Sequence, residues 1–128
     1  MIDGHILRAL RGATTVASDD GTLIREATAE LLAAMLQRND VDRDRIVSMW
    51  FTASHDLRAE FPAVAAREMG MNRVPLMCAA EIDVPGSLPR CVRVMMHCYM
   101  DAGRDPRHVY LRDAVRLRPD LASEADVQ

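Results

Sequence analysis

One segment of the sequence has a clear helical period, and most apolar segments around it do not. Between Thr22 and Arg38 the apolar side chains recur at three- and four-residue spacing, which places them on one face of an amphipathic helix. The preceding residues 18–21, Ser-Asp-Asp-Gly, supply turn and N-cap chemistry, and the helix is expected to end near Asn39. The sequence therefore favours a fold in which this helix packs against strands.

Five other segments have the composition or the two-residue alternation of strands. They are residues 6–17, 46–52, 74–82, 91–100 and 108–118, the last ending in the alternating Val115-Arg116-Leu117-Arg118. Pro62 suits the first turn of a second, shorter helix, and Gly70 suits its C-terminal cap. The expected order is strand, helix, strand, helix and three strands.

This order predicts an α+β fold, with a mixed β-sheet of about five strands and two main helices on one face. A chain of 128 residues suits a single domain. We assign that domain to residues 1–118, and we expect residues 119–128 to form a flexible C-terminal tail because they have no periodic apolar pattern. The apolar content of segments 46–52 and 91–100 favours burial of both sheet faces, and hence an oligomer.

The distribution of charge argues against a nucleic-acid partner. All 16 basic residues are Arg, and the three acids after residue 118 leave residues 1–118 with 16 acidic residues and no formal net charge. A domain without net charge has no net field to attract a polyanion.

No apolar run is long enough for a membrane span, and the N-terminus has an acid where a signal peptide would be basic. We therefore expect no membrane association and a cytoplasmic protein.

The common catalytic and metal-binding motifs are missing from the sequence. The cysteines Cys78, Cys91 and Cys98 are odd in number and form no Cys-x-x-Cys pair, which argues against a disulfide framework and a zinc site. There is no Gly-rich phosphate loop and no Gly-x-Ser-x-Gly elbow. We therefore expect neither a metal nor a nucleotide cofactor.

Three charged residues interrupt strands that are otherwise apolar: Arg11, Glu81 and Arg93. A charge in such a position must face solvent, form an ion pair or line a polar pocket, because a buried unpaired charge is costly. For each residue alone, an exposed face with surface ion pairs is the simpler interpretation. Together with Tyr110, the three residues can also form one pocket for an anionic ligand, and spacing does not decide between these alternatives.

A series of short motifs in a fixed order makes a more specific prediction. They are Arg11-Gly12-Ala13-Thr14-Thr15-Val16, Asp56-Leu57, Phe61-Pro62-Ala63, Arg67-Glu68, Val74-Pro75, Cys78 with Glu81, Asp83-Val84, Cys91-Val92-Arg93-Val94-Met95-Met96, His108-Val109-Tyr110-Leu111 and Leu117-Arg118-Pro119-Asp120-Leu121. The chain closely resembles the small monofunctional chorismate mutases of the trimeric, AroH-type class. The motifs extend from about residue 6 to residue 121, nearly the whole chain.

The resemblance implies a homotrimer with a pseudo-α/β-barrel core and active sites in clefts between subunits. It also implies the reaction, an intramolecular [3,3] (Claisen) rearrangement of chorismate to prephenate in phenylalanine and tyrosine biosynthesis. The expected partners are this substrate, this product and other copies of the chain. The resemblance implies no cofactor, no metal and no covalent intermediate.

The resemblance also assigns roles to individual residues. Arg93 is expected to donate to the ether oxygen, which gains negative charge as its bond breaks, and Arg11 to bind a substrate carboxylate; both are expected to be catalytic. Glu81, the third catalytic residue, is expected to accept a hydrogen bond from the ring hydroxyl and to stabilise the electron-deficient ring. Tyr110 is expected to bind a carboxylate, and Cys78 to lie near the ring hydroxyl unless it is simply a small core residue.

Further positions match residues that line the cleft in the family. Phe61 and Arg67 on the second helix segment are expected to contact substrate, although Arg67 can equally be a solvated charge. Met77 is expected to bind substrate where the family often has a smaller hydroxylated residue. Val64 stands where relatives can carry Lys, which suggests weaker binding of the dianion.

A second hypothesis is a non-catalytic trimeric ligand-binding protein, or a relative of the small trimeric enamine deaminases with similar intersubunit clefts. The missing basic residue at Val64 supports it. The joint presence of Arg11, Cys78, Glu81, Arg93 and Tyr110 favours the mutase instead.

Overall fold

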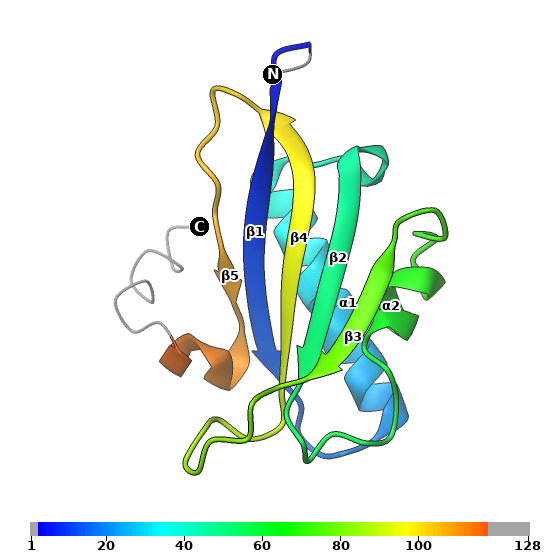
Figure 1. Ribbon diagram of the computed structural model, residues 1–128, viewed down its shortest axis with the longest axis vertical. Helices are drawn as coiled ribbons and strands as arrows, with labels where there is room; N and C mark the ends of the chain where they lie inside the picture. The colour runs from blue at the N-terminus through cyan, green and yellow to red at the C-terminus, as the bar shows by residue number, and fades with distance from the viewer. Residues whose placement is uncertain (1–2, 118–128) are drawn as a thin grey trace.

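A single five-stranded sheet organises the computed structural model, which describes residues 3–117. Along the chain the elements are β1 (His5–Thr15), α1 (Gly21–Asn39), the 3₁₀ turn η1 (Arg43–Arg45), β2 (Ile46–Ala53), α2 (Ala63–Glu68), β3 (Leu76–Ala80), β4 (Cys91–Asp101), β5 (Val109–Tyr110) and the 3₁₀ helix η2 (Arg112–Leu117). In space the strand order is β3-β2-β4-β1-β5 (Figure 1). The expected α+β architecture is confirmed.

The sheet mixes two kinds of pairing. The central strand β4 is antiparallel to both β1 and β2. The two edges are parallel, because β3 pairs with β2 and the short β5 pairs with β1. Each parallel pair needs a crossover, and α2 lies in the connection between β2 and β3.

The helix α1 has the caps that its flanking sequence predicts. The carboxylate of Asp20 accepts a hydrogen bond from the backbone N–H of Leu23 at 3.0 Å, which satisfies one of the free donors of the first turn. At the other end Asp40 adopts a left-handed conformation with φ 52°, where the helix stops. Ile24, Leu31 and Met35 on the inner face are fully buried.

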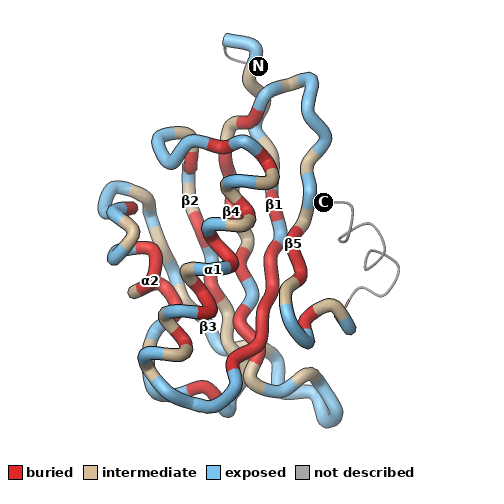
Figure 2. The backbone as a smooth tube through the Cα atoms, turned by 180° about the vertical axis from the view of Figure 1, so that it is seen from behind, coloured by how far each residue is buried: buried red, intermediate tan, exposed pale blue. Residues whose placement is uncertain are grey.

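Both helices cover the same face of the sheet, as Figure 2 shows from behind. The core forms between α1 and the inward-facing residues of the strands. On β4 the inward residues are Val92, Val94, Met96, Cys98 and Met100, and all are buried. Strand alternation therefore directs the odd-numbered residues of β4 to the opposite face.

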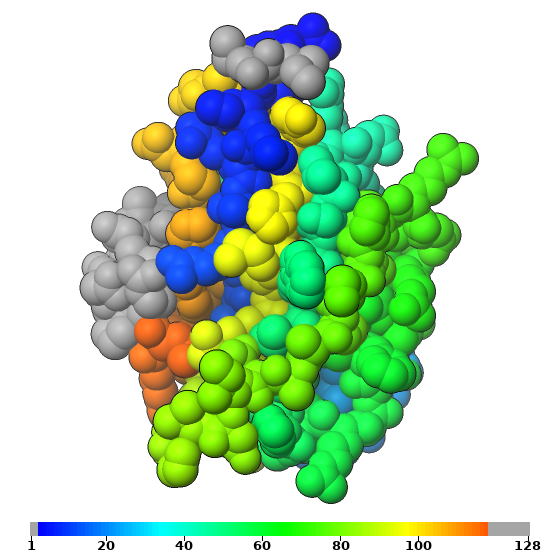
Figure 3. All heavy atoms as spheres, in the orientation of Figure 1, coloured from blue at the N-terminus to red at the C-terminus, as the bar shows by residue number. Residues whose placement is uncertain are grey.

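Neither α1 nor α2 lies over the opposite face of the sheet in Figure 1, and Figure 3 shows this face in space-filling form. Large apolar side chains remain accessible on its strands: Leu7 is 51% exposed, Trp50 46% and Met77 57%. An isolated domain rarely leaves several such residues together in water. This exposure agrees with the expectation that another subunit covers the face.

The expectation of a strand running to residue 118 was wrong. The strand β5 contains only Val109 and Tyr110, and residues 112–117 form the 3₁₀ helix η2. Arg112 has a φ of 53°, a left-handed conformation that ends extended structure. Burial of Ala114 against Ala13 and Tyr110 then holds the turn in place. The tail expected at 119–128, like residue 118, lies outside the described residues.

Other boundaries differ by smaller amounts. The second helix runs over 63–68, with Pro62 at its N-cap and Gly70, whose φ is 91°, directly after its C-cap residue Met69, as the sequence predicts. The third strand runs over 76–80 rather than 74–82. Pro75 lies immediately before that strand, and proline cannot donate to a sheet ladder.

A search of the helices within residues 3–117 finds none with the length and apolar character of a transmembrane span.

The close approach of β1 to α1 gives the first testable prediction. A Cβ added at Gly12 would lie 2.5 Å from the sulfur of Met35 and 3.1 Å from Cδ1 of Leu31. Because both side chains are fully buried, Gly12→Ala should lower the free energy of unfolding by about 1–3 kcal/mol through overpacking. Denaturant titration measures this loss.

Gly103→Ala is the matched control. Its added Cβ would meet its nearest atom, Oδ1 of Asp101, at an ordinary 3.5 Å. The two variants should therefore differ clearly in the denaturant concentration at the midpoint of unfolding. Equal stability of both would contradict the packing described here.

Candidate active site

A row of aligned residues crosses the open face of the sheet from β2 to β5. Arg93 on β4 pairs with Thr52 on β2 and with Ala13 on β1, and Ala13 in turn pairs with Tyr110 on β5. Residues paired in register project to the same side of a sheet. The alternation that buries Val92 and Val94 therefore places the Arg93 side chain on the face that the helices leave open.

The neighbouring row supplies the second arginine. Met95, two residues after Arg93 on β4, pairs with Arg11 on β1 and with Trp50 on β2. Because side chains two apart on a strand share a face, Arg11 and Arg93 lie on the same face, diagonally across the β1–β4 pair. The register thus brings together two cations that are 82 positions apart in the sequence.

A cavity of about 300 Å³ lies over these two rows. This volume is at the lower end of the range of ligand pockets, roughly 300–1,000 Å³. Its lining is Arg11, Gly12, Ala13, Trp50, Thr52, Glu81, Arg93, Val94, Met95, Tyr110 and Leu117. The structure therefore brings Arg11, Glu81, Arg93 and Tyr110 around one cavity.

Glu81 reaches this cavity from the segment just after β3. Its backbone N–H donates to the carbonyl of Ala53 at 2.9 Å, and its carbonyl lies 2.8 Å from Nε2 of His55. Its side-chain Oε2 accepts a hydrogen bond from the hydroxyl of Thr52 at 2.5 Å and lies 3.6 Å from Nε of Arg93. Because Arg93 is about half exposed, the ion pair adds little stability, and its main effect is to orient both groups.

The charges around the cavity suit an anion. Among its lining residues two are arginines and one is a carboxylate, so the formal balance is positive. Arg can hold a carboxylate through two parallel hydrogen bonds. Tyr110, only 8% exposed, adds a phenol at the β5 side. The arrangement can therefore bind and polarise a small anionic ligand.

The remaining expected site residues do not line this cavity. Phe61 and Cys78 line a second one, of about 470 Å³, between the end of β3 and the loop before α2. Cys78 pairs with buried Phe51 and packs against the core, so it faces away from Arg93. Met77 pairs with Trp50 on the open face, and Arg67 is exposed on α2. Within one chain the expected site residues thus form separate groups.

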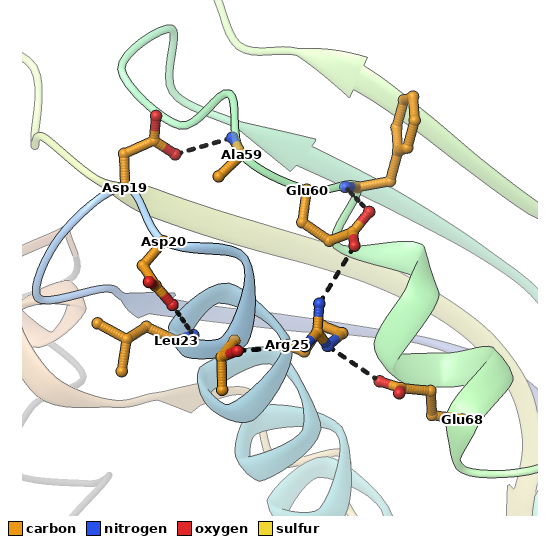
Figure 4. Close-up of polar contacts among 9 residues, drawn as sticks. Asp19, Asp20, Leu23, Arg25, Ala59, Glu60 and Glu68 are labelled. Atoms are coloured by element: carbon orange, nitrogen blue, oxygen red, sulfur yellow. Dashed lines mark hydrogen bonds and ion pairs between the residues drawn. The ribbon is translucent and has the colours of Figure 1, made fainter.

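The loop that carries Phe61 is attached to α1 by charged side chains (Figure 4). Oδ1 of Asp19 accepts hydrogen bonds from the backbone N–H groups of Arg58 and Ala59 at 2.8 and 2.9 Å. Arg25 lies between two carboxylates, 3.2 Å from Glu60 and 3.5 Å from Glu68. These contacts hold the loop and α2 against α1 while Phe61 stays 66% exposed.

Seven of the eleven lining residues of the first cavity were not expected in the site, and Trp50, Thr52 and Leu117 are among them. Trp50 and Thr52 share the two-residue alternation of β2, so a register with Arg93 could have placed them. That register was not predictable, because the antiparallel β2–β4 pairing joins segments about 40 residues apart. Leu117 was expected on a strand, and the turn of η2 brings it to the cavity instead.

The two buried cysteines, Cys91 and Cys98, do not line this cavity. Burial raises the pKa of the Cys98 thiol to about 11, and it also raises the pKa of Cys91. Both thiols are therefore protonated at neutral pH. Within residues 3–117, no three His, Cys, Asp or Glu side chains are placed to hold a metal ion.

A mixed α+β sheet with two arginines, a glutamate and a tyrosine around one cavity is an arrangement that can bind a small anionic ligand. The family model described as chorismate mutase type I matches residues 7–121, so the chain belongs to that family. This confirms the resemblance found in the motifs.

Individual relatives agree with the assignment. The chain is 50% identical over 120 residues to chorismate mutase AroH of Thermus thermophilus, covering 92% of this chain and 98% of the relative. It is 44% identical over 119 residues to chorismate mutase AroH of Bacillus subtilis (strain 168), covering 91% and 94%. A solved chorismate mutase from Clostridium thermocellum superposes with a TM-score of 0.79 at 47% identity, covering 84% of this chain and 96% of that structure.

Asp56 ties the strand that carries Arg93 to the loop after β2. Its carboxylate accepts the backbone N–H of Arg90 at 3.0 and 3.1 Å and the hydroxyl of Ser54 at 2.5 Å. Partial burial raises the pKa of this carboxyl, but the bonds from Ser54 and Arg90 outweigh it, and the net pKa lies below the ordinary 3.8. The ionised form is therefore favoured in the folded protein.

This shift predicts how acid affects stability. Because the folded pKa is the lower one, the stabilisation by Asp56 is complete above the unfolded pKa and is lost as pH falls through the folded pKa. Asp56→Asn should therefore be less stable than the parent above about pH 5, and the difference should shrink as the pH falls below about 4. Urea titrations at several pH values measure it, and a pH-independent difference would contradict the assignment.

Proposed function

We propose that this protein is a chorismate mutase that converts chorismate to prephenate in the biosynthesis of phenylalanine and tyrosine. The observation that carries the proposal is the convergence of Arg11, Glu81, Arg93 and Tyr110 on one cavity, in a chain of the chorismate mutase type I family. The reaction rearranges bonds within one molecule, so it needs no nucleophile, redox partner or second substrate. We propose that no cofactor takes part.

Arg93 stabilises the charge that develops in the transition state. The ether bond of chorismate breaks ahead of carbon–carbon bond formation, which leaves partial negative charge on the ether oxygen and partial positive charge on the ring. A guanidinium donor held at that oxygen favours the transition state over the ground state. Thr52 and Glu81 hold Arg93 from the β2 side: Thr52 bonds to Glu81, and Glu81 pairs with Arg93.

The other residues bind and orient the substrate. Arg11 and Tyr110 bind its carboxylates, and Glu81 accepts the ring hydroxyl and faces the electron-deficient ring. Chorismate has a flexible enolpyruvyl arm, and fixing that arm over the ring removes much of the entropic cost of reaction. Because the rearrangement removes no proton, Glu81 acts as an electrostatic and orienting group rather than as a base.

The complete site forms between copies of the chain in a cytoplasmic homotrimer with a pseudo-α/β-barrel core. Each copy contributes Arg11, Glu81, Arg93 and Tyr110 to one site, and Phe61, Arg67, Met77 and Cys78 to the site of a neighbour. Two features support this arrangement: the separation of these groups within one chain, and the exposed Leu7, Trp50 and Met77 on the open face. Family membership does not favour the deaminase or non-catalytic alternative.

The role of Arg93 predicts a specific kinetic defect. Arg93→Ala should lower kcat by about 10²–10³-fold, because it removes a donor that acts mainly in the transition state. KM should rise much less. Loss of chorismate absorbance, with no added cofactor, measures both constants.

Arg104→Ala is the control, since Arg104 lies on the loop after β4, does not line the cavity, and forms a surface ion pair with Asp40 at 3.8 Å. It should keep the parental kcat. A folded Arg93→Ala variant with parental kcat would contradict the mechanism.

A site shared between copies predicts complementation. In a trimer of identical copies, either Arg93→Ala or Arg67→Ala damages every site. In mixed trimers, however, a site can combine Arg93 of one copy with Arg67 of another. Equal co-expression should restore about a quarter of the parental activity, since random assembly leaves that share of sites intact.

A mixture of Arg93→Ala with Arg11→Ala is the matched control, because both changes fall in the same group and no intact site can form. Light scattering should give a mass about three times 14.3 kDa for each sample. No recovery in the first mixture would place the site within one chain.

A further inference from the structure

His108 makes a side-chain contact with the backbone that carries Arg11. It stands immediately before β5, and its ring Nδ1 accepts a hydrogen bond from the backbone N–H of Arg11 at 3.0 Å. The two residues are 97 positions apart in the sequence. The contact joins the start of β5, which carries Tyr110, to the strand that carries Arg11.

The ring occupies a place that a backbone carbonyl would take in a longer ladder. The carbonyl of Ala13 accepts the N–H of Leu111 at 2.9 Å, so residues 11 and 13 of β1 both direct their polar groups toward β5. With Gly12 paired to Val109 and Ala13 to Tyr110, the next acceptor in register for Arg11 would be the carbonyl of Arg107.

That carbonyl is turned toward a different partner. The side chain of Asn39, fully buried at the end of α1, donates to the Arg107 carbonyl at 2.9 Å and accepts the Arg107 N–H at 2.7 Å. Asn39 also donates to the carbonyl of Met35 at 2.8 Å. A buried amide with these bonds is satisfied and fixes the backbone of residue 107, so the His108 ring completes the ladder in its place.

We propose that His108 is a positioning residue for the mutase reaction, which aligns Arg11 with Tyr110 by accepting the Arg11 N–H. The proposal rests on the function proposed above. The Arg11 side chain is exposed on the open face. Because β5 extends for only two residues, the ladder that joins it to β1 is short, and the His108 bond extends it to the residue that carries the guanidinium. Arg11 binds substrate and transition state alike, so disorder at Arg11 should weaken substrate binding more than it slows the chemical step.

Substitutions that differ only in the acceptor test this role. His108→Leu keeps a branched side chain of similar bulk but has no acceptor, whereas the Oδ1 of His108→Asn can occupy the position of Nδ1. His108→Leu should raise KM by about three- to tenfold with less than about a twofold change in kcat. His108→Asn should return KM to within about twofold of the parent.

His5→Leu is the matched control, since His5 lies at the start of β1 and its ring contacts the carbonyl of Asp3. It should leave KM unchanged. A parental KM in folded His108→Leu, or no rescue by asparagine, would overturn the proposal.

Amide hydrogen exchange at Arg11 tests the bond without any substrate. The Arg11 amide should exchange about three- to tenfold faster in His108→Leu than in the parent or in His108→Asn. Equal exchange in all three proteins would overturn the proposal. A parent protein that fails to convert chorismate would instead contradict the proposed function, while exchange would still report on the bond.

Discussion

The antiparallel pairing of β1 with β4 is the constraint on which the site depends. It runs through eleven residue pairs, from His5 with Asp101 to Thr15 with Cys91. A shift of one residue would exchange the two faces of a strand, which would bury Arg93 in the core and expose Val92 and Val94. The cost of burying that charge, added to the loss of the apolar core, fixes the register and with it the diagonal placement of Arg11 and Arg93.

The helix face and the open face of the sheet therefore have separate tasks. Packing of α1 on the inner face supplies the stability, so the open face can carry charges that contribute little to folding. Charges left half exposed keep much of their hydration until a ligand or another surface covers them. This division explains how the sheet can hold two arginines near each other, of which Arg93 forms an ion pair with Glu81.

The sequence predicted the parts of the molecule that follow from local periodicity. The span of α1, the two-residue alternation of β4 and the unusual position of charges in apolar strands led to the α+β fold and to Arg11, Glu81 and Arg93. The motif resemblance gave Tyr110 its role and added Phe61, Arg67, Met77 and Cys78. Features that depend on the backbone conformation of a single residue or on strand register were not predictable. The left-handed Arg112 that ends β5 has no distinctive neighbours in the sequence. The contact of His108 with Arg11 requires the register of the parallel β1–β5 pair.

The central claim is that one dianionic metabolite is held on the open sheet face, between the arginines of one copy and the residues around α2 of the next. A crystal structure of the protein with bound prephenate tests it most directly. We predict that the product's carboxylates contact Arg11, Arg93 or Tyr110 of one copy, that its ring hydroxyl lies near Glu81, and that Phe61 and Arg67 of a second copy close the site. Prephenate bound entirely by residues of one copy, or away from Arg93, would contradict the account.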